Sequence, residues 1–584
     1  MVEVTDKLFG KAGRRRALAP TLEPHDKKRL FNAFRVVEGV EPDFAAALRK
    51  LARKWVDDGE SLELRATSLL VADLFEQGWR FSIQGGQIVF EPPGLSRQGD
   101  EDIDAVKERV RQTLEVGRER QLAEPSVRQF IARMERQTLR PDGRRTSVLD
   151  LIDSGSALAE AVERIRATPP ERQAAALKGL VDAEIEVCEA GIRCKDTGLL
   201  LIDIWRYFRH TWRHEYRSIP GRQMMLLVRN RARPNRPVIG IAMLASPVMR
   251  LSTRDDWIGW LRPSAERLVM SGEWPAHEFG KALSARLEAS IADLRWDDLA
   301  TPAEIARPTE AVVFRLQQKA YGAAAKREAA LRKTYGAAGA AAKRPARVDT
   351  KNVDLDWKAA SEDLLFLRKR AEGLAELLLA KMILSEYRLR RAKTAKAEAE
   401  RLFANKRGQR AVEIAMTEFR KAGLSSRVSD VSVCGAVHPY NELLGGKLVA
   451  LLLCSKDVRQ AYAKRYGGQI SVIASQMAGR PIDKPADLQL LTTTSLYGVG
   501  SSQYNRLALR LEDHPGLPFT LRWRALKQKH TGGYGTLHLS AETVDALRRV
   551  GEVRHDARRI NNLFGEGTSP RLRQVREGLD ALGV

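Results

Sequence analysis

The sequence predicts a mixed α+β protein in which one mixed-sheet domain is split by a long basic helical insertion. Three observations predict this class. Apolar residues recur at three- and four-residue spacing through much of the N-terminal part, as is typical of helices. Strand-like apolar runs occur at 224–246 and return after Gly423. Between them, residues 262–425 are rich in Ala, Lys and Arg and have the pattern of long helices.

The chain length predicts several domains. A chain of 584 residues exceeds what one hydrophobic core usually supports, so we expect roughly two to four of them. The predicted divisions are a tail (1–24), a helical N-terminal module with one hairpin (25–168), the first half of the α/β domain (169–261), the basic helical insertion (262–425), and the second half of the α/β domain with the C-terminal helices (426–584).

The N-terminal module is predicted from its periodicity. Residues 26–77 contain three helical segments, and residues 102–137 contain further helices. Residues 78–93 alternate apolar and polar side chains around Gly85-Gly86, which predicts a two-stranded hairpin. Thr146 and Ser147 provide hydroxyls suited to cap the next helix.

Both halves of the α/β domain are predicted from short apolar runs. RLSTRDDWIGW, residues 250–260, follows the first pair of strands and is predicted to be a loop that could line a site. LVALLLCSKDVRQAYAKR, residues 448–465, has the apolar pattern of one amphipathic helix. The predicted strands are MMLLVRN (224–230), PVIGIAMLAS (237–246), VSVCGAV (431–437), ISVIASQM (470–477) and LQLLTTTSLY (488–497), with RLALRLE (506–512) and FTLRWRAL (519–526) as a further candidate.

The insertion is predicted to be helical and cationic. Residues 357–423 have the pattern of one long helix or of a pair, and an Ala-rich cationic stretch precedes them. Runs of Lys and Arg on helices are most often solvated faces, but the density of one charge here favours contact with phosphate backbones. Lys343 and Arg344 are the candidate nucleic-acid contacts in this region.

Net charge is the strongest guide to partners. The chain has 98 Lys and Arg against 74 Asp and Glu, a net charge of +24, which predicts a polyanionic partner and favours nucleic acid. The other explanation is a generally basic proteome rich in Arg and Ala codons. A second candidate contact is the turn between the strands at 224–246, where Arg231, Arg233 and Arg236 form either a solvated tip or a phosphate contact.

The sequence has no pattern typical of a signal peptide, a membrane span or a zinc site, and this predicts a cytoplasmic protein with reduced cysteines. The highly charged first 29 residues do not have the pattern of a signal peptide, and no apolar stretch approaches the length of a membrane span. The cysteines, Cys188, Cys194, Cys434 and Cys454, do not have the spacing of a zinc site, so no metal ligands are predicted.

The most distinctive local motif is a strand, a glycine-rich turn and a helix start between Val431 and Arg465. Such a turn places unpaired backbone N–H groups around one point, where Gly445, Gly446 and Lys447 form a candidate phosphate site. The spacing is not that of a P-loop. The alternative is a tight packing turn that needs no ligand.

Three further residues are candidates for catalysis. Tyr504 lies in a dense polar loop and could serve as a general acid, although the loop also makes sense as a purely structural one. Asp255 could be a base or a metal ligand, but an acid beside an arginine is more often part of a buried ion pair. Glu442 could act as a base or cap the helix that follows it. No cofactor is indicated by the sequence.

The order of predicted elements is similar to that of the acetyl-coenzyme A-dependent N-acyltransferases, in which a hairpin is followed by a strand that opens into a helix N-terminus. That resemblance implies an acyltransferase-like split domain and a glycine-containing turn that holds a pyrophosphate. It is a similarity of fold and does not by itself imply activity.

A second resemblance rests on separated motifs in one order. The motifs are DIWRYFRHTW, PGRQMMLLVRNRA, RPVIGIAMLAS, RDDWIGW, NELLGGKLVALL, TTTSLYGVGSSQYNRL and FGEGTSPRLRQVREGL. Together they resemble the DruA family, named for a component of the Druantia anti-phage defence system, over roughly residues 140–584. The resemblance implies a role in bacterial antiviral defence beside other proteins, including a large helicase-like component.

Three hypotheses follow from the sequence. The first is a nucleic-acid-binding subunit of a defence complex, which needs no catalytic residue. The second is an acyltransferase-like or nucleotide-binding enzyme that uses Lys447 and Tyr504. The third is a mobile-element accessory protein or a Mg²⁺-dependent nuclease that uses Asp255. The first is favoured because it rests on both the net charge and the family resemblance.

Overall fold

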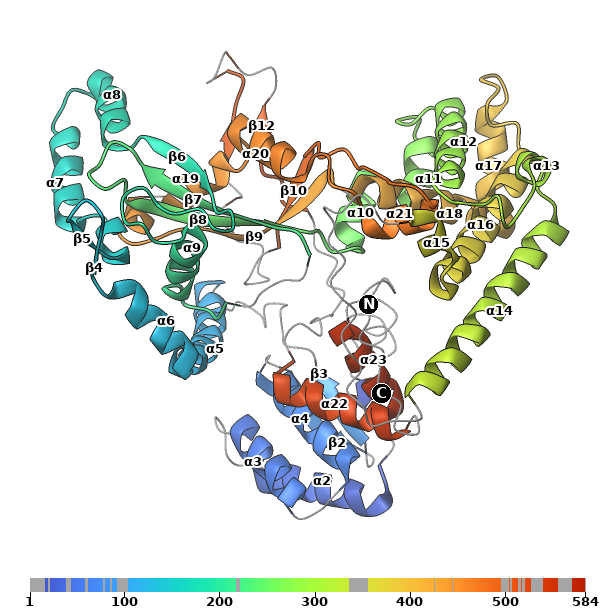
Figure 1. The fold of residues 1–584 in the computed structure, drawn as a ribbon, viewed down its shortest axis with the longest axis horizontal. Coiled ribbons are helices and arrows are strands. Elements are labelled where there is room, and N and C mark those ends of the chain that lie inside the picture. The colour runs from blue at the N-terminus through green and yellow to red at the C-terminus, as the bar shows by residue number, and fades with distance from the viewer. Residues whose placement is uncertain are drawn as a thin grey trace.

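The structure is a computed structural model, and it contains three groups of elements that we call the terminal lobe, the sheet body and the helical lobe (Figure 1). The residues that it describes are 16–18, 22–37, 44–57, 61–76, 79–84, 87–91, 103–216, 221–335, 356–424, 426–443, 445–494, 504, 507–512, 516, 520–526, 539–554 and 570–582. No helix in these ranges combines the length and the apolar character that crossing a membrane requires.

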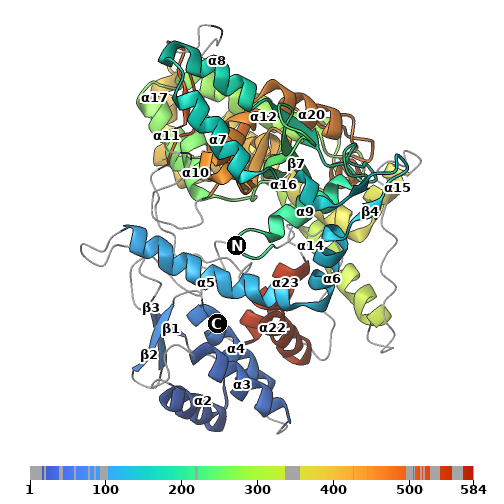
Figure 2. The same cartoon turned by 90° about the vertical axis from the view of Figure 1, so that its left-hand side faces the viewer.

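The terminal lobe joins the two ends of the chain in one core (Figures 1 and 2). Leu30, Leu69, Leu547 and Leu579 are fully or almost fully buried in that core. Asp73 connects the two ends, since its carboxylate accepts hydrogen bonds from Arg49 and from the backbone N–H of Ser540. The helices are α2 (Pro24–Val37), α3 (Phe44–Asp57), α4 (Leu62–Glu76), α22 (Ala541–Arg554) and α23 (Pro570–Leu582), and the strands are β1 (Arg16–Leu18), β2 (Arg80–Gln84) and β3 (Gln87–Glu91).

This lobe differs from the predicted divisions in three respects. The predicted hairpin forms from β2 and β3, and β1 of the expected tail adds a third, antiparallel strand beside β3. The C-terminal helices pack here and not on the second half of the α/β domain. Residues 124–168, predicted to belong to the N-terminal module, contribute side chains to the sheet body.

The sheet body contains a five-stranded mixed sheet in the order β10-β9-β8-β7-β6. Strand β9 follows the insertion yet pairs antiparallel with β8, which precedes it, and β10 pairs parallel with β9. The prediction that the two sheet-forming parts of the chain close into one mixed sheet is therefore confirmed. The strands are β6 (Ala183–Val187), β7 (Gln223–Asn230), β8 (Val238–Ala245), β9 (Val428–Ala436) and β10 (Leu490–Thr492).

Helices cover both faces of this sheet. Leu226 and Val228 of β7 point into a core shared with Val458 and Tyr462, whereas Leu227 points into the opposite core around Trp205. Burial on both faces explains why β7 and β8 are nearly continuous apolar runs. The covering elements are α6 (Pro125–Glu135), η1 (Val148–Leu151) and α9 (Leu201–His210) on one face, and α7 (Gly155–Arg166), η2 (Tyr440–Leu443), α19 (Gly445–Leu452) and α20 (Lys456–Tyr466) on the other.

The remaining elements near the sheet body are small or peripheral. Helix α5 (Ile103–Ala123) leads into α6, and α8 (Pro170–Leu180) follows α7. The candidate fourth strand of the second half proves to be a separate two-stranded pair outside the main sheet. The short strands are β4 (Thr138–Leu139), β5 (Arg145–Thr146), β11 (Ala508–Leu509) and β12 (Leu521–Arg522).

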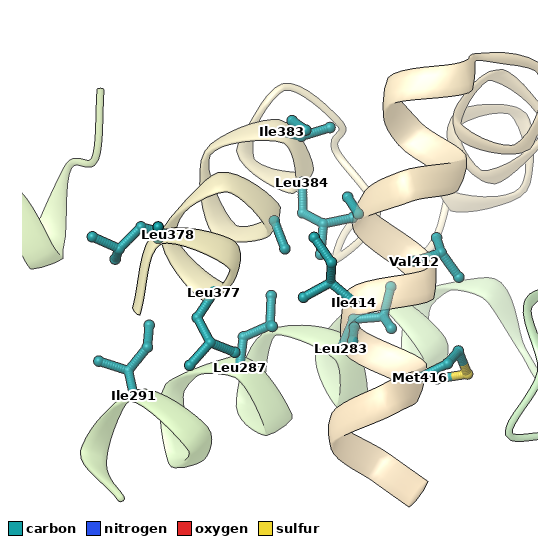
Figure 3. Close-up of a cluster of buried hydrophobic side chains, with 14 of the residues drawn as sticks. Leu283, Leu287, Ile291, Leu377, Leu378, Ile383, Leu384, Val412, Ile414 and Met416 are labelled. Atoms are coloured by element: carbon teal, nitrogen blue, oxygen red, sulfur yellow. The ribbon is translucent and has the colours of Figure 1, made fainter. Parts of the chain in front are cut away.

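The helical lobe is the insertion, and it has a hydrophobic core of its own (Figure 3). Leu283, Leu378 and Val412 come from three different helices and are almost completely buried there. The lobe consists of α11 (Arg262–Met270), α12 (Ala276–Ala292), α13 (Pro302–Ala306), α14 (Glu310–Tyr335), α15 (Trp357–Glu362), α16 (Leu364–Ser385), α17 (Ala395–Ala404) and α18 (Lys406–Leu424).

Four local predictions were wrong, and three have a visible cause. RLSTRDDWIGW contains α10 (Ser252–Ile258), because the Asp255 carboxylate accepts the backbone N–H of Leu251 at the start of that turn. The helix predicted over 448–465 breaks where the Ser455 hydroxyl caps α20. The region 357–423 is divided into α15 to α18, with Asp363 capping α16 and Asn405 accepting the N–H of Arg407. ISVIASQM forms helix α21 (Val472–Ala478) and not a strand.

Helix α21 connects the sheet body with the helical lobe. It lies between α20 and β10 in sequence but packs against α15 and α16. The backbone N–H of Arg295, after α12, donates to the carbonyl oxygen of Met477 at 2.9 Å. The chain then returns to the sheet body, where Ala486 and Leu488 are buried. Helix α21, a segment predicted to be a strand of the sheet, therefore connects the sheet body with the helical lobe.

Candidate functional site

The glycine-rich turn is closely packed against the sheet. Gly445 is the first residue of α19 and is buried. A Cβ atom at Gly445 would lie 2.6 Å from the carbonyl oxygen of Tyr440 and 2.9 Å from the Cβ of Ala436, so only glycine fits. Gly446 and Lys447 are half-buried. Packing accounts for Gly445 without a ligand, and phosphate binding by Gly445, Gly446 and Lys447 stays a prediction.

The neighbouring buried group is Tyr440 and not Glu442. Glu442 is exposed and accepts a hydrogen bond from the side-chain amide of Asn441 at 2.7 Å. The Tyr440 hydroxyl donates to Asp153 at 2.5 Å and accepts from the Asn230 side-chain amide at 2.8 Å. This network ties η2 to the end of β7, and local sequence could not reveal it because 210 or more residues separate Tyr440 from its partners.

Tyr504 lies against the helix that begins at the glycine-rich turn. Its ring centroid is 4.8 Å from that of Trp523, whose indole N–H points to the carbonyl oxygen of Ala450 at 3.4 Å. Burial raises the pKa of Cys434 to about 12, although a hydrogen bond with Tyr504 opposes the rise, and burial raises the pKa of Cys454 to about 11. Both thiols are therefore protonated near neutral pH and are poor nucleophiles. A role of Tyr504 as a general acid stays a prediction.

Asp255 is enclosed by basic side chains. It is 1% exposed and accepts hydrogen bonds from Arg254 at 2.9 and 2.7 Å, while Arg420 of α18 lies 3.7 Å away. This is the buried ion-pair arrangement that the sequence left as the alternative to catalysis. The described residues contain no group of three or more His, Cys, Asp and Glu side chains that could hold a metal ion.

The three arginines of the hairpin tip, Arg231, Arg233 and Arg236, all have carboxylate partners. Arg231 contacts Asp182 at 2.9 Å, and Arg233 contacts Asp153 at 2.9 Å. Arg236 contacts both Asp196, at 2.8 Å, and Glu184, at 3.2 Å. The structure thus gathers these arginines at one end of the sheet, where acidic groups compensate their charge. Phosphate contact by them stays a prediction.

A second cluster of cations is exposed and uncompensated. We call Arg388, Arg391, Lys393 and Lys396, between the end of α16 and the first turn of α17, the cationic turn. All four are exposed, and none forms an ion pair with a described carboxylate. Helix α17 lies at the end of the helical lobe that is remote from the terminal lobe (Figures 1 and 2). Lys343 and Arg344, the candidates named from sequence, lie outside the described residues.

The cationic turn could have been found from the sequence. RLRRAKTAK, residues 388–396, contains five basic residues and no acidic one. What the sequence did not show is which of these charges remain free. Arg390, in the same run, lies 3.8 Å from Glu288, whereas the other four basic residues are exposed and have no described carboxylate partner.

Comparison with known proteins gives one family. Residues 187–270 and 413–584 match the family described as Druantia protein DruA. Over these two segments, the chain is similar to the DruA family. The unmatched stretch between them contains most of the helical lobe, including the cationic turn. A relative named Druantia protein DruA, from Escherichia coli (strain UMEA 4076-1), is 38% identical over 155 residues.

The match to that relative is partial. It covers 26% of this chain and 34% of the relative, so the chain matches about a third of the relative's length. No solved structure is significantly similar to this chain. The comparisons thus show a similarity of the matched segments to that family, whereas the geometry of the sites comes from this structure alone.

Proposed function

We propose that this protein is a nucleic-acid-binding component of a Druantia-type anti-phage defence system, and that it works with a helicase-like partner. The similarity of the two matched segments to the DruA family supports the setting. The observation that carries the binding proposal is the cationic turn, where four exposed basic side chains have no described carboxylate partner.

The physical argument concerns counterions. A basic side chain that already contacts a carboxylate must lose that contact to bind a phosphate, whereas a free one releases condensed counterions from the nucleic acid. Contacts of this kind hold a strand or duplex without recognising its sequence. The cationic turn is therefore expected to contribute affinity that depends strongly on salt and weakly on sequence.

The test removes these charges together. In the variant Arg388→Gln/Arg391→Gln/Lys393→Gln/Lys396→Gln, affinity for duplex DNA should fall by about tenfold or more at 100 mM salt. The slope of log affinity against log salt should become shallower by about two to four. Fluorescence anisotropy with two duplexes of unrelated sequence, at several salt concentrations, measures both quantities.

A matched variant controls for net charge. Arg128→Gln/Arg136→Gln/Arg164→Gln/Arg172→Gln removes the same number of exposed cations from α6, α7, α8 and the residue after α6. This control should retain most of the affinity. Equal weakening by the two variants would show that only net charge matters, and unchanged binding by the cationic-turn variant would refute the assignment of the surface.

The defence setting is tested in cells. Bacteria that carry the complete gene set should lose protection against phage when the cationic-turn variant replaces the native chain, with unchanged protein level. The control variant should protect normally. Full protection by the cationic-turn variant would show that defence does not require nucleic-acid binding at this surface.

The enzymatic alternatives have weaker support. An acyltransferase-like or nucleotide-binding enzyme would need a ligand at Gly445 to Lys447, where packing already explains Gly445. A Mg²⁺-dependent nuclease would need a free carboxylate at Asp255, which instead contacts Arg254 and Arg420. Thermal stabilisation by coenzyme A that is lost in Lys447→Ala would support the acyltransferase-like enzyme. Mg²⁺-dependent DNA cleavage that is lost in Asp255→Asn would support the nuclease.

A further inference from the structure

The C-terminal end of α20 contains two buried tyrosines whose hydroxyls have no acceptor. Tyr462 is 2% exposed and Tyr466 is 8% exposed, and their ring centroids are 4.8 Å apart. Neither hydroxyl has an acceptor for its proton among the described residues, since the side chains that interact with them, Arg222 at Tyr462 and Arg465 at Tyr466, are donors. A buried donor without an acceptor costs about 1–3 kcal/mol, so two of them side by side call for an explanation.

Two arginines approach the same tyrosines from different elements. The Arg222 guanidinium, just before β7, is 5.6 Å from the centroid of the Tyr466 ring, and the Arg465 guanidinium is 5.8 Å from it. Burial raises the pKa of Tyr462, and the nearby positive charge of Arg222 opposes that rise. Guanidinium groups only donate hydrogen bonds, so neither arginine can accept the hydroxyl protons.

These arginines are not neutralised by the protein. Neither Arg222 nor Arg465 forms an ion pair with a described carboxylate, although both are half-buried. A half-buried cation without a counter-charge loses part of its hydration, and no ion pair compensates that loss. The arginines and the tyrosine hydroxyls therefore share one deficit, which is an acceptor with negative charge.

A third cation, in the connection between the sheet body and the helical lobe, interacts with Arg222. Lys484 lies where the chain returns from α21 to the sheet body, and it is half-buried. Burial lowers the pKa of Lys484, Arg222 and Arg286 lower it further, and Asp293 and Glu418 oppose this. Of these acids, Glu418 already contacts Lys421 at 2.7 Å, and no ion pair joins either acid to Lys484. Lys484 therefore adds positive charge on the side of the helical lobe.

We propose that Arg222, Arg465, Tyr462 and Tyr466, with Lys484 near Arg222, form a binding site for a phosphate monoester. A phosphate dianion offers several oxygen acceptors, which suit two hydroxyl donors and two or three cations at once. The ligand is the terminal phosphate of a nucleic-acid strand or of a free nucleotide. The site is separate from the cationic turn, and all five residues fall within the two family-matched segments.

The experiment compares strand ends on the full chain. A fluorescent single-stranded oligonucleotide with a 5′-phosphate should bind about tenfold or more tightly than the same oligonucleotide with a 5′-hydroxyl. The variant Tyr462→Phe/Tyr466→Phe, which retains both rings, should abolish that difference. Inorganic phosphate and AMP are added as competitors. Competition by AMP at micromolar concentration would identify a free nucleotide as the ligand. A preference for the 5′-phosphate without competition by AMP would identify the strand end.

Two further variants separate this site from the other proposals. The cationic-turn variant should weaken binding of both oligonucleotides equally and retain the preference for the 5′-phosphate. Arg222→Gln should abolish the preference and leave duplex affinity at high salt unchanged. The thermal midpoint of Tyr462→Phe/Tyr466→Phe should be maintained or raised, because its substitutions remove unsatisfied hydroxyls.

The proposal fails on either of two results. One is that the intact protein shows no preference for the 5′-phosphate and no competition or stabilisation by phosphate or AMP. The other is that the preference persists in Tyr462→Phe/Tyr466→Phe. If the protein binds duplex DNA normally but does not prefer the 5′-phosphate, only the phosphate site is refuted. If it prefers the 5′-phosphate but the cationic turn does not contribute to duplex binding, only the proposed function is refuted.

Discussion

The hairpin tip and the cationic turn are both short, basic segments, but only the arginines of the hairpin tip have carboxylate partners. At the tip, Arg231, Arg233 and Arg236 contact acids that come from other parts of the chain. At the cationic turn, four exposed basic residues have no described carboxylate partner. A basic run therefore predicts a binding surface only when folding leaves its charges without carboxylate partners.

The difference has a topological cause. The hairpin tip lies at one end of the sheet, where other strand ends and loops bring Asp153, Asp182 and Asp196 to the same place. The cationic turn connects two helices at the outer end of a lobe, where few other segments approach (Figure 1). Loops on such an outer surface are accessible to a large polyanion.

The largest effect is expected inside the hairpin. Arg229 is fully buried and contacts Glu186 and Asp196, each at 2.9 Å. Arg229→Gln should destabilise the sheet body by about 3 kcal/mol, because it leaves the Glu186 carboxylate without a partner and removes one of the two cations at Asp196. Hydrogen exchange of β7 and β8 measures this loss. Salt-dependent DNA affinity of the folded variant should be unchanged, and a drop in affinity would give the hairpin a binding role.

An intermediate effect is expected on acidification. Burial raises the pKa values of Asp153 and Asp196, but hydrogen bonds and charge from Arg233, Arg236, Arg229 and Tyr440 outweigh burial and leave both values below the ordinary 3.8. The folded pKa values are thus below the unfolded ones. The stability that these acids contribute is complete above about pH 4 and is lost as the pH falls through the folded values.

Hydrogen exchange of β7 and β8, corrected for intrinsic exchange, should therefore show weaker protection at pH 3 than at pH 5. The cationic turn should keep its charge over this range, because Arg and Lys do not titrate there. Equal protection of β7 and β8 at both pH values would contradict the pairing at the tip.

The smallest effect is expected at the exposed end of the tip. Arg231 and Asp182 form an ion pair in which both side chains are about half exposed. Such pairs contribute little to stability, so Arg231→Gln should unfold at the same temperature as the native protein. Its DNA affinity should also be unchanged within error. A loss comparable to that of a single substitution in the cationic turn, such as Lys393→Gln, would show that the tip also contacts phosphate.

Much of the fold was accessible from local sequence patterns. The apolar runs of β7, β8 and β9 were strong enough to predict the strands, and the basic insertion was recognised as helical. ISVIASQM misled because it is a short run rich in Ile and Val, a pattern that a strand and a short helix share. Docking of this segment on α15 and α16 decided in favour of a helix.

The candidate site was less predictable than the fold. Gly445 attracted attention for a good reason, since its position admits no side chain, but the cause is a carbonyl oxygen and not a ligand. Tyr462 and Tyr466 drew no attention, because tyrosines four residues apart on a helix are ordinary core residues. Only the approach of Arg222, from more than 200 residues earlier, makes them a candidate binding site.

The sequence by itself determined the class of secondary structure, the excess of positive charge and the family motifs, because these depend on residues that are near one another in the chain. The tertiary structure decided which charges are free, which hydroxyls lack acceptors, and that β9 pairs with β8 across the insertion. These properties depend on atoms brought together from distant parts of the chain, and a local pattern does not contain that information.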